Sequence, residues 1–288
     1  VWEASGHIGA FNDPLVDCKK CKARYRADEL FDGELNDGDW NKITCPNCGT
    51  TGNLTEPRQF NLMFKTHVGP IEEDSNIAYL RPETAQGIYV NYLLTQNAMR
   101  LKVPFGIAQI GKAFRNEIVA RNFIFRTREF EQMEMQYFVK PGDDDASMKD
   151  WKSERLNFYN QLGINPKKLR FHEHGPNELA HYAKEAWDIE FEFPFGWSEI
   201  EGIHNRTDYD LARHQELSGK KMEVFDQPNN ERFLPFIIET SAGLNRMMLA
   251  VLSDAYWEDE ENNRVVMKFH PKIAPAKAVV CPLVKKDG

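Results

Sequence analysis

The residues best suited to chemistry near the start of the chain are four cysteines, Cys18 with Cys21 and Cys45 with Cys48. Two Cys-x2-Cys pairs can supply four thiolates to one tetrahedral metal ion, and this ligand set is typical of zinc. Because four thiolates leave no open coordination position, a zinc ion here would be structural rather than catalytic. The alternative is a group of four unliganded, buried thiols.

A second candidate site lies between residues 111 and 136, where the sequence GKAFRNEIVARNFIFRTREFEQMEMQ mixes arginines, glutamates and phenylalanines. Guanidinium groups match phosphate oxygens, and an aromatic face can stack on a purine. Carboxylates can hold Mg²⁺ on the phosphates or an amine elsewhere on the ligand. The stretch therefore suits a polyanion that bears a flat ring. The alternative is an exposed hairpin held by salt bridges.

The second half of this stretch alternates as a β-strand does. One face is apolar, and the other carries Phe130, Gln132, Glu134 and Gln136. If two strands are joined by a loop, the arginines of the first half are expected beside Phe130 and Glu134. These arginines are Arg115, Arg121, Arg126 and Arg128.

The segment ETSAGLNR, residues 239–246, is a third candidate. Arg246 falls in the first turn of a predicted helix, where a cation opposes the helix dipole unless an anion binds there. Gly243 would let a ligand approach the backbone closely. Glu239 and Ser241 share one face of an otherwise buried strand, which is difficult to explain without a ligand. For Arg246 alone, the alternative is a side chain that bends out to solvent.

Hydrophobic periodicity predicts the elements that must position these residues. Helices are expected over 83–100, 151–163 and 244–256, and an acidic loop over 141–150. Strands are expected over 104–114, 129–140, 189–205 with a break at 194–196, and 232–243, and a last strand from 275. Hairpin-like spacing, with helices between strands rather than after each one, predicts an α+β fold with a mostly antiparallel sheet.

Composition limits the class of protein. With 288 residues and 41% hydrophobic content the chain can bury a full-sized core, and its net charge of −8 argues against a nonspecific nucleic-acid coat. No apolar run is long enough to span a bilayer. Five cysteines without a secretory signal favour a reducing cytosol. Because the chain does not begin with Met, we expect it to be part of a longer protein.

Several motifs together resemble the class II aminoacyl-tRNA synthetases. FRNE (114–117) and REFEQMEM (128–135) are similar to the two strands of motif 2, and GLNRMMLAVL (243–252) is similar to motif 3. LRPETAQGIY (80–89) and SGH (5–7) narrow the resemblance to glycyl-tRNA synthetases of the homodimeric type, over nearly the whole chain. The resemblance implies an antiparallel six- or seven-stranded sheet flanked by helices.

The same resemblance implies a division of the chain and an activity. It places the N-terminal part of the catalytic domain at 1–16, a zinc-ribbon-like insert at 17–53, the catalytic domain at 54–273 and the start of an anticodon-binding domain at 274–288. Motif 1 is expected mostly before Val1. The implied activity is ATP-dependent activation of glycine to glycyl-adenylate and transfer to tRNA(Gly), as a glycine–tRNA ligase.

Roles for the nucleotide-binding residues follow from the resemblance. Arg115 is expected on the α-phosphate, Arg246 on the γ-phosphate, and Glu199 with the Ile200 backbone on Mg²⁺ and ATP. Arg115, Arg246 and Glu199 form the expected catalytic set. The whole set expected at ATP is Arg115, Asn116, Glu117, Phe125, Arg126, Thr127, Arg128, Glu129, Phe130, Glu199, Ile200, Gly243, Leu244, Asn245 and Arg246.

Glycine has no side chain that a pocket could recognise. A pocket that selects glycine must therefore bind its ammonium group and leave no room for the methyl group of alanine. Carboxylates suit the ammonium, with Glu83, Glu134 and Glu239 expected nearest to it. Arg206 is expected to orient these carboxylates. The whole set expected at glycine is Glu83, Phe130, Glu131, Gln132, Met133, Glu134, Glu239, Thr240, Ser241, Ala242 and Gly243.

The expected partners are glycine, ATP and tRNA(Gly), in a cytoplasmic homodimer that does not bind membranes. The first alternative is a catalytically inactive class II synthetase-like accessory protein that binds nucleic acid, which should lose the phosphate-binding arginines. A second alternative is a zinc-ribbon interaction module on an inert scaffold. A third is a synthetase for another small amino acid.

Overall fold

The computed structural model describes residues 1–30, 40, 42–176, 178–180 and 182–283. Its centre is a six-stranded sheet in the order β6–β7–β13–β10–β9–β8, in which every neighbouring pair is antiparallel. The strands are β6 (Phe105–Phe114), β7 (Glu129–Val139), β8 (Leu169–Glu173), β9 (Glu185–Phe193), β10 (Gly196–Thr207) and β13 (Phe236–Gly243). The predicted α+β fold with an antiparallel sheet is confirmed.

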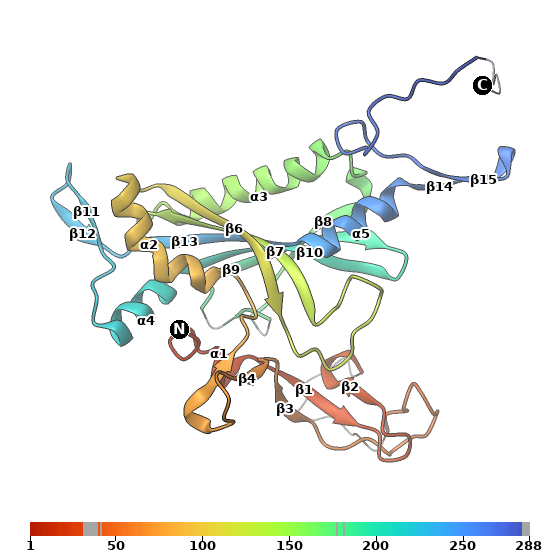
Figure 1. Cartoon of the computed structure of the whole chain (residues 1–288), viewed down its shortest axis with the longest axis horizontal. Coiled ribbons are helices and arrows are strands. Elements are labelled where there is room, and N and C mark those ends of the chain that lie inside the picture. Colours follow the sequence, from red (N-terminus) through yellow and green to blue (C-terminus); the bar gives the residue numbers. More distant parts are fainter. Residues whose placement is uncertain (31–39, 41, 177, 181, 284–288) are drawn as a thin grey trace.

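Helices lie on both sides of this sheet (Figure 1). On one face, α3 (Asp144–Gln161) and α5 (Leu244–Ala255) bury apolar side chains in one core cluster with the strands. On the other face, α2 (Ala85–Met99) and α4 (Tyr209–Ser218) form a second cluster at one end of the sheet. The rest of that second face is therefore available for a binding site.

Smaller elements surround the central sheet. Strands β1 (Asn12–Asp17), β2 (Arg24–Arg26) and β3 (Arg58–Asn61) form a three-stranded sheet that flanks the cysteine pairs. Three hairpins are formed by β4 (Lys65–His67) with β5 (Ile77–Tyr79), β11 (Val224–Asp226) with β12 (Glu231–Phe233), and β14 (Tyr256–Asp259) with β15 (Arg264–Met267). The short helices are α1 (His7–Ala10), η1 (Ala27–Glu29), η2 (Asp74–Asn76), η3 (Pro166–Lys168) and η4 (Glu260–Asn262).

The acidic loop predicted over 141–150 is wrong, because α3 begins at Asp144. Three consecutive aspartates look like a solvated loop, but acidic side chains in a first helical turn interact favourably with the helix dipole. Asp144 is also buried, and its carboxylate accepts hydrogen bonds from Lys184 and Asn205 at 2.8 Å each. Tertiary contacts therefore stabilise a helix start that the local sequence does not reveal.

Two strand predictions also need correction. The segment 232–243 forms two strands, β12 and β13, because the chain breaks at Leu234 and Pro235. No strand forms from 275 to 283, where the side chains are exposed, and 284–288 lie outside the described residues. Residues 31–39 and 41 also lie outside the described residues. In the described part of the chain, no helix is both long and apolar enough to cross a membrane.

Candidate active site and cysteine cluster

A cleft opens over β7, β13, β10 and β9, on the sheet face that α2 only partly covers. Glu134, Ser241 and Gly202 lie side by side across three strands, because Ser241 pairs in register with both of the others. Alternation then directs every second residue of each strand into the cleft. The lining residues are Glu83, Arg115, Glu117, Ile124, Phe125, Arg126, Thr127, Phe130, Glu131, Gln132, Glu134, His174, Tyr182, Asp188, Glu199, Gly202, His204, Glu239, Ser241, Gly243, Asn245 and Arg246.

Arg115 lines the cleft where β6 ends and the loop to β7 begins. Its Nε donates to the carbonyl of Pro82 at 3.1 Å, which fixes the base of the guanidinium group. The guanidinium lies 5.3 Å from the ring centres of both Phe11 and Phe130. The hairpin prediction that placed Arg115 beside Phe130 is therefore confirmed.

Arg246 enters the same cleft from the first turn of α5. Its guanidinium donates to the carboxylate of Glu199 at 2.8 Å and to the carbonyl of Phe125 at 3.1 Å, and it lies 4.2 Å from the Phe125 ring centre. Enclosure in the cleft would raise the pKa of Glu199, but Arg246 and Arg115 outweigh it, so this pKa lies below its usual range. Arg115, Glu199 and Arg246 all line this one cleft, so the two arginines converge on the same site.

A β-bulge in β10 explains why Glu199 faces the cleft. The register with β9 shifts between Glu199 and Glu201, so that the extra residue Ile200 sends the two glutamates to opposite faces. Glu201 is fully buried on the far face, where it accepts hydrogen bonds from Arg155 and Tyr159. Glu199 remains 46% exposed beside Arg246.

Glu239 has one permanently cationic partner, Arg206, and two further side-chain partners on the floor of the cleft. Arg206 donates to both of its oxygens at 3.1 Å, His204 Nδ1 lies 2.9 Å away, and Gln136 donates at 2.6 Å. Burial would raise the pKa of Glu239, but Arg206 and His204 outweigh burial and lower it to about 2. Arg206 is itself fixed by Asp210 at 2.7 Å, as its predicted orienting role requires.

Glu83 also has a partner that can carry positive charge, since His7 Nε2 lies 3.3 Å from its carboxylate. Its other oxygen accepts from the side chain of Gln86 at 3.1 Å, so Glu83 does not cap the backbone of α2. Burial would raise the pKa of Glu83, but His7 and Arg206 outweigh burial and hold it well below its usual range.

Glu134 differs from the other two carboxylates, because in the described part of the chain its hydrogen bonds come from neutral groups. Thr84 donates its N–H at 2.7 Å and also its hydroxyl, and Ser241 donates its hydroxyl at 2.9 Å. Burial, together with repulsion from Glu239 and Glu83, raises the pKa of Glu134 to about 7. Glu134 is therefore a buried carboxylate of the cleft that lacks a cationic partner among the residues that the structure describes.

Most of the predicted site residues line this one cleft, but several do not. Met133, Thr240 and Ala242 alternate onto the far face, where Met133 and Ala242 pack in the core with Ile200. These residues can reach a ligand only through their backbone. Others lie outside the lining: Asn116, Arg128, Glu129 and Leu244. Arg128 is exposed and donates to the Glu117 carbonyl at 3.1 Å, and exposed Glu129 pairs with Lys112.

The cleft also contains residues that the sequence did not indicate. His174 Nε2 lies 2.9 Å from Asp188, and burial and Glu199 raise the pKa of Asp188 to about 6 against the opposing effect of His174. Gly202 provides room for the His204 ring, since a Cβ there would lie 2.7 Å from His204 Cε1. Strand alternation is the signal that could have assigned Asp188, Gly202 and His204 to the inner face.

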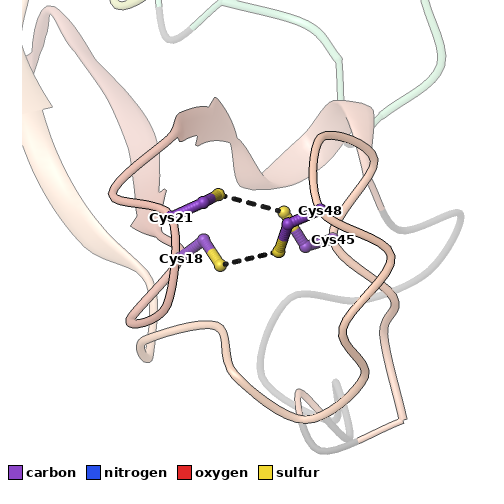
Figure 2. Close-up of side chains that lie close together, drawn as sticks. All are labelled: Cys18, Cys21, Cys45 and Cys48. Carbon is purple, nitrogen blue, oxygen red and sulfur yellow. Dashed lines mark hydrogen bonds between the residues drawn. The ribbon is translucent and has the colours of Figure 1, made fainter.

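The four cysteines of the two pairs converge as the spacing predicts (Figure 2). Their Sγ atoms lie within 4.8 Å of one another, with 3.8 Å between Cys18 and Cys48 and 3.7 Å between Cys21 and Cys45. A disulfide needs about 2.05 Å. The edge of a tetrahedron with Zn–S bonds of about 2.3 Å is about 3.8 Å. The cluster is therefore compatible with one tetrahedral metal ion.

Comparison with known proteins gives a family for most of the chain. Residues 64–255 match the family described as "tRNA synthetase class II core domain (G, H, P, S and T)". The matched segment includes the whole six-stranded sheet and the first turn of α5.

Individual proteins are similar over the full chain. In alignments that cover all of this chain, the sequence is 59% identical to a glycine–tRNA ligase of Treponema denticola and 51% identical to one of Cutibacterium acnes. The chain spans only 64% and 65% of the length of these curated relatives. A solved structure of prolyl-tRNA synthetase from Giardia lamblia in complex with prolyl-adenylate aligns with 67% of this chain and 37% of its own, at a TM-score of 0.54 and 17% identity. This last likeness concerns the fold alone.

Proposed function

Because this chain belongs to the family of class II tRNA synthetase core domains, we propose that its cleft activates glycine with ATP to form glycyl-adenylate, the first step of glycyl-tRNA synthesis. The observation that carries the proposal is the convergence of Arg115 and Arg246 on a cleft whose floor holds Glu134, which has no cationic partner within the described ranges. Two guanidinium groups suit the phosphates, and an unpaired buried carboxylate suits the glycine ammonium.

In the proposed reaction, a carboxylate oxygen of glycine attacks the α-phosphorus of ATP. The bond from that phosphorus to the bridging oxygen breaks, and pyrophosphate leaves with the electron pair. No protein nucleophile is needed, so catalysis depends on positioning and charge neutralisation. We assign Arg115 to the α-phosphate, Arg246 to the γ-phosphate and Glu199 to the Mg²⁺ that accompanies ATP, since Mg²⁺ prefers carboxylate oxygens.

Two buried acceptors support an adenine site near Phe130. In the described part of the chain, Glu117 Oε2 and Gln132 Oε1 have no hydrogen-bond partner, although both residues are more than 90% buried and line the cleft. Buried polar atoms usually find a partner, so these acceptors suit a donor on the ligand. We assign Glu117 to the adenine amino group and Phe130 to stacking on the ring.

Glycine selection follows from the crowding around Glu134. Attraction cannot discriminate against alanine, because its extra methyl group only adds contacts worth ~1–3 kcal/mol. Exclusion must come from side chains that already fill the space around the ammonium. Ser241 donates a hydrogen bond to Glu134, and Glu83 and Glu239 line the same cleft. We assign to these side chains the exclusion of a Cβ beside the ammonium.

The remaining parts of the proposal concern the whole protein. We propose that the longer protein transfers glycine to tRNA(Gly), as a cytoplasmic homodimer, and that residues 274–288 begin its anticodon-binding domain. Residues 17–53 would form the insert, and 54–273 with 1–16 the catalytic unit. The inactive accessory protein is less well supported, because Arg115 and Arg246 are both retained in the cleft.

The proposed function predicts ATP–pyrophosphate exchange that depends on glycine. The purified chain should catalyse this exchange with glycine at least about 100-fold faster than with alanine or serine, because the pocket excludes a Cβ. Exchange at equal rates with all three amino acids would contradict glycine selection. No exchange with any of them would contradict the assignment of an active site to this chain.

We also propose that Cys18, Cys21, Cys45 and Cys48 hold one structural zinc ion. The Sγ separations fit a tetrahedron of thiolates, and four ligands leave no position for a substrate. When bound, the ion would join the two cysteine pairs, around which the described apolar residues of the insert form only a small cluster. Such small units commonly depend on the metal for folding.

Elemental analysis should find about one zinc per chain, in line with four thiolate ligands. Cys45→Ser should lose this zinc and make the segment 17–53 more sensitive to limited proteolysis. Cys281→Ser is the matched control, because Cys281 is exposed and lies outside the cluster. If the purified wild-type chain contains no zinc, or Cys45→Ser retains it, the metal assignment is wrong.

A further inference from the structure

Residues 17–53, which carry the four clustered cysteines and are called the cysteine insert below, contact the loop between β6 and β7. The contact is made by one carboxylate that two arginines of the loop share. Glu29 lies at the end of η1, within the insert, and its Oε1 accepts hydrogen bonds from Arg121 at 2.7 Å and from Arg126 at 2.6 Å. Figure 1 shows this loop reaching down from β6 and β7 to the region of β1 and β2. A single oxygen therefore joins two arginines of the loop to a separate part of the fold.

Glu29 is held in place from the insert side. Arg26 of β2 lies 4.0 Å from Glu29, and it also pairs with Asp13 at 2.8 Å and Asp28 at 2.6 Å. These residues belong to β1, β2 and η1, the elements that flank the cysteine pairs. The position of Glu29 thus depends on the structure of the insert.

On the loop side of the contact, one of the two arginines also lines the cleft. Arg126 lines the cleft and is only 16% exposed, and its neighbour Phe125 accepts a hydrogen bond from Arg246 through its carbonyl. Backbone hydrogen bonds in both directions between Arg121 and Arg126, at 3.1 and 3.2 Å, close the loop into one unit. Movement of either arginine would therefore move the loop that contacts Arg246.

We propose that Glu29 is a positioning residue for the nucleotide, which acts by fixing Arg121 and Arg126 and couples the cysteine insert to the cleft. Without this carboxylate, two guanidinium groups that now share one oxygen would repel each other and separate. ATP binding would then have to order the loop as well as occupy the cleft, which weakens binding. The kinetic part of this inference rests on the proposed function, but the structural part does not.

The test compares Glu29→Gln with Asp28→Asn. The first change removes the charge that both loop arginines contact, whereas Asp28 is the adjacent acid that contacts Arg26 without contacting the loop. Glu29→Gln should raise the KM for ATP in pyrophosphate exchange about three- to tenfold, as expected for two partly exposed ion pairs, with the KM for glycine unchanged. Asp28→Asn should leave both KM values unchanged.

Hydrogen exchange provides a readout that does not depend on activity. Amides of residues 117–127 should exchange faster in Glu29→Gln than in the wild-type chain, and those of α3 should not change. An unchanged or lowered KM for ATP, or unchanged exchange in the loop, would overturn the proposal. If the wild-type chain shows no glycine-dependent activity, the proposed function fails, and the hydrogen-exchange comparison still decides whether Glu29 orders the loop.

Discussion

Replacing Arg246 by alanine should lower glycine-dependent pyrophosphate exchange by about 10³-fold, the scale at which arginines contribute to phosphoryl-transfer transition states. The guanidinium group of Arg246 lies at the N-terminal end of α5, where it contacts the Phe125 ring and the carboxylate of Glu199. Because the Glu199 carboxylate is half-exposed, a triphosphate can replace it as the partner of Arg246. In Arg246→Ala, the negative charge that develops on the departing pyrophosphate would lose one of the cations that we assign to the phosphates.

The fold should survive this change, because the Arg246–Glu199 ion pair is partly exposed and such pairs contribute little stability. Thermal unfolding should therefore show a small shift, and the loss should appear in kcat rather than only in the KM for ATP. Arg264→Ala is the matched control, since Arg264 pairs with Asp259 in the β14–β15 hairpin, away from the cleft. Near-normal exchange by Arg246→Ala would show that the arginine has no role in the reaction.

Sequence patterns could predict the part of the site that lies within one hairpin, because its residues are close together in the sequence. Alternation over 129–139 placed Phe130 and Glu134 on one face, and hairpin spacing brought Arg115 beside Phe130. The orientation of Glu199 could not be derived in this way. It depends on a bulge at Ile200, which no composition signal marks.

The rest of the site depends on contacts between distant segments. His174 directly follows β8, and Asp188 and His204 lie on β9 and β10, so only the strand order β10–β9–β8 brings the three polar residues together. The Asp144 start of α3 was missed for the same reason, because its partners Lys184 and Asn205 are far along the chain. Patterns within one segment report which face is buried, but they do not report which segment lies opposite.

The affinity for glycine should depend on pH through Glu134. Its pKa is raised to about 7, because burial and the charges of Glu239 and Glu83 disfavour the ionised form. The glycine ammonium prefers the carboxylate, so below pH 7 binding must first remove a proton from Glu134. The KM for glycine should therefore rise about tenfold from pH 8 to pH 6, since the ionised fraction falls by about that factor across a pKa near 7.

Glu134→Gln separates this titration from that of the other groups in the cleft. The amide keeps the size of the side chain but cannot ionise, so the KM for glycine should be about 100-fold higher at pH 8, and it should no longer change between pH 8 and pH 6. Asp188, with a pKa of about 6, would remain in the variant and would still titrate. A pH dependence that persists in Glu134→Gln would therefore exclude Glu134 and point to another group of the cleft, such as the pair of Asp188 and His174. Glu192→Gln is the matched control, because Glu192 is an exposed strand glutamate outside the cleft, and it should keep the wild-type profile.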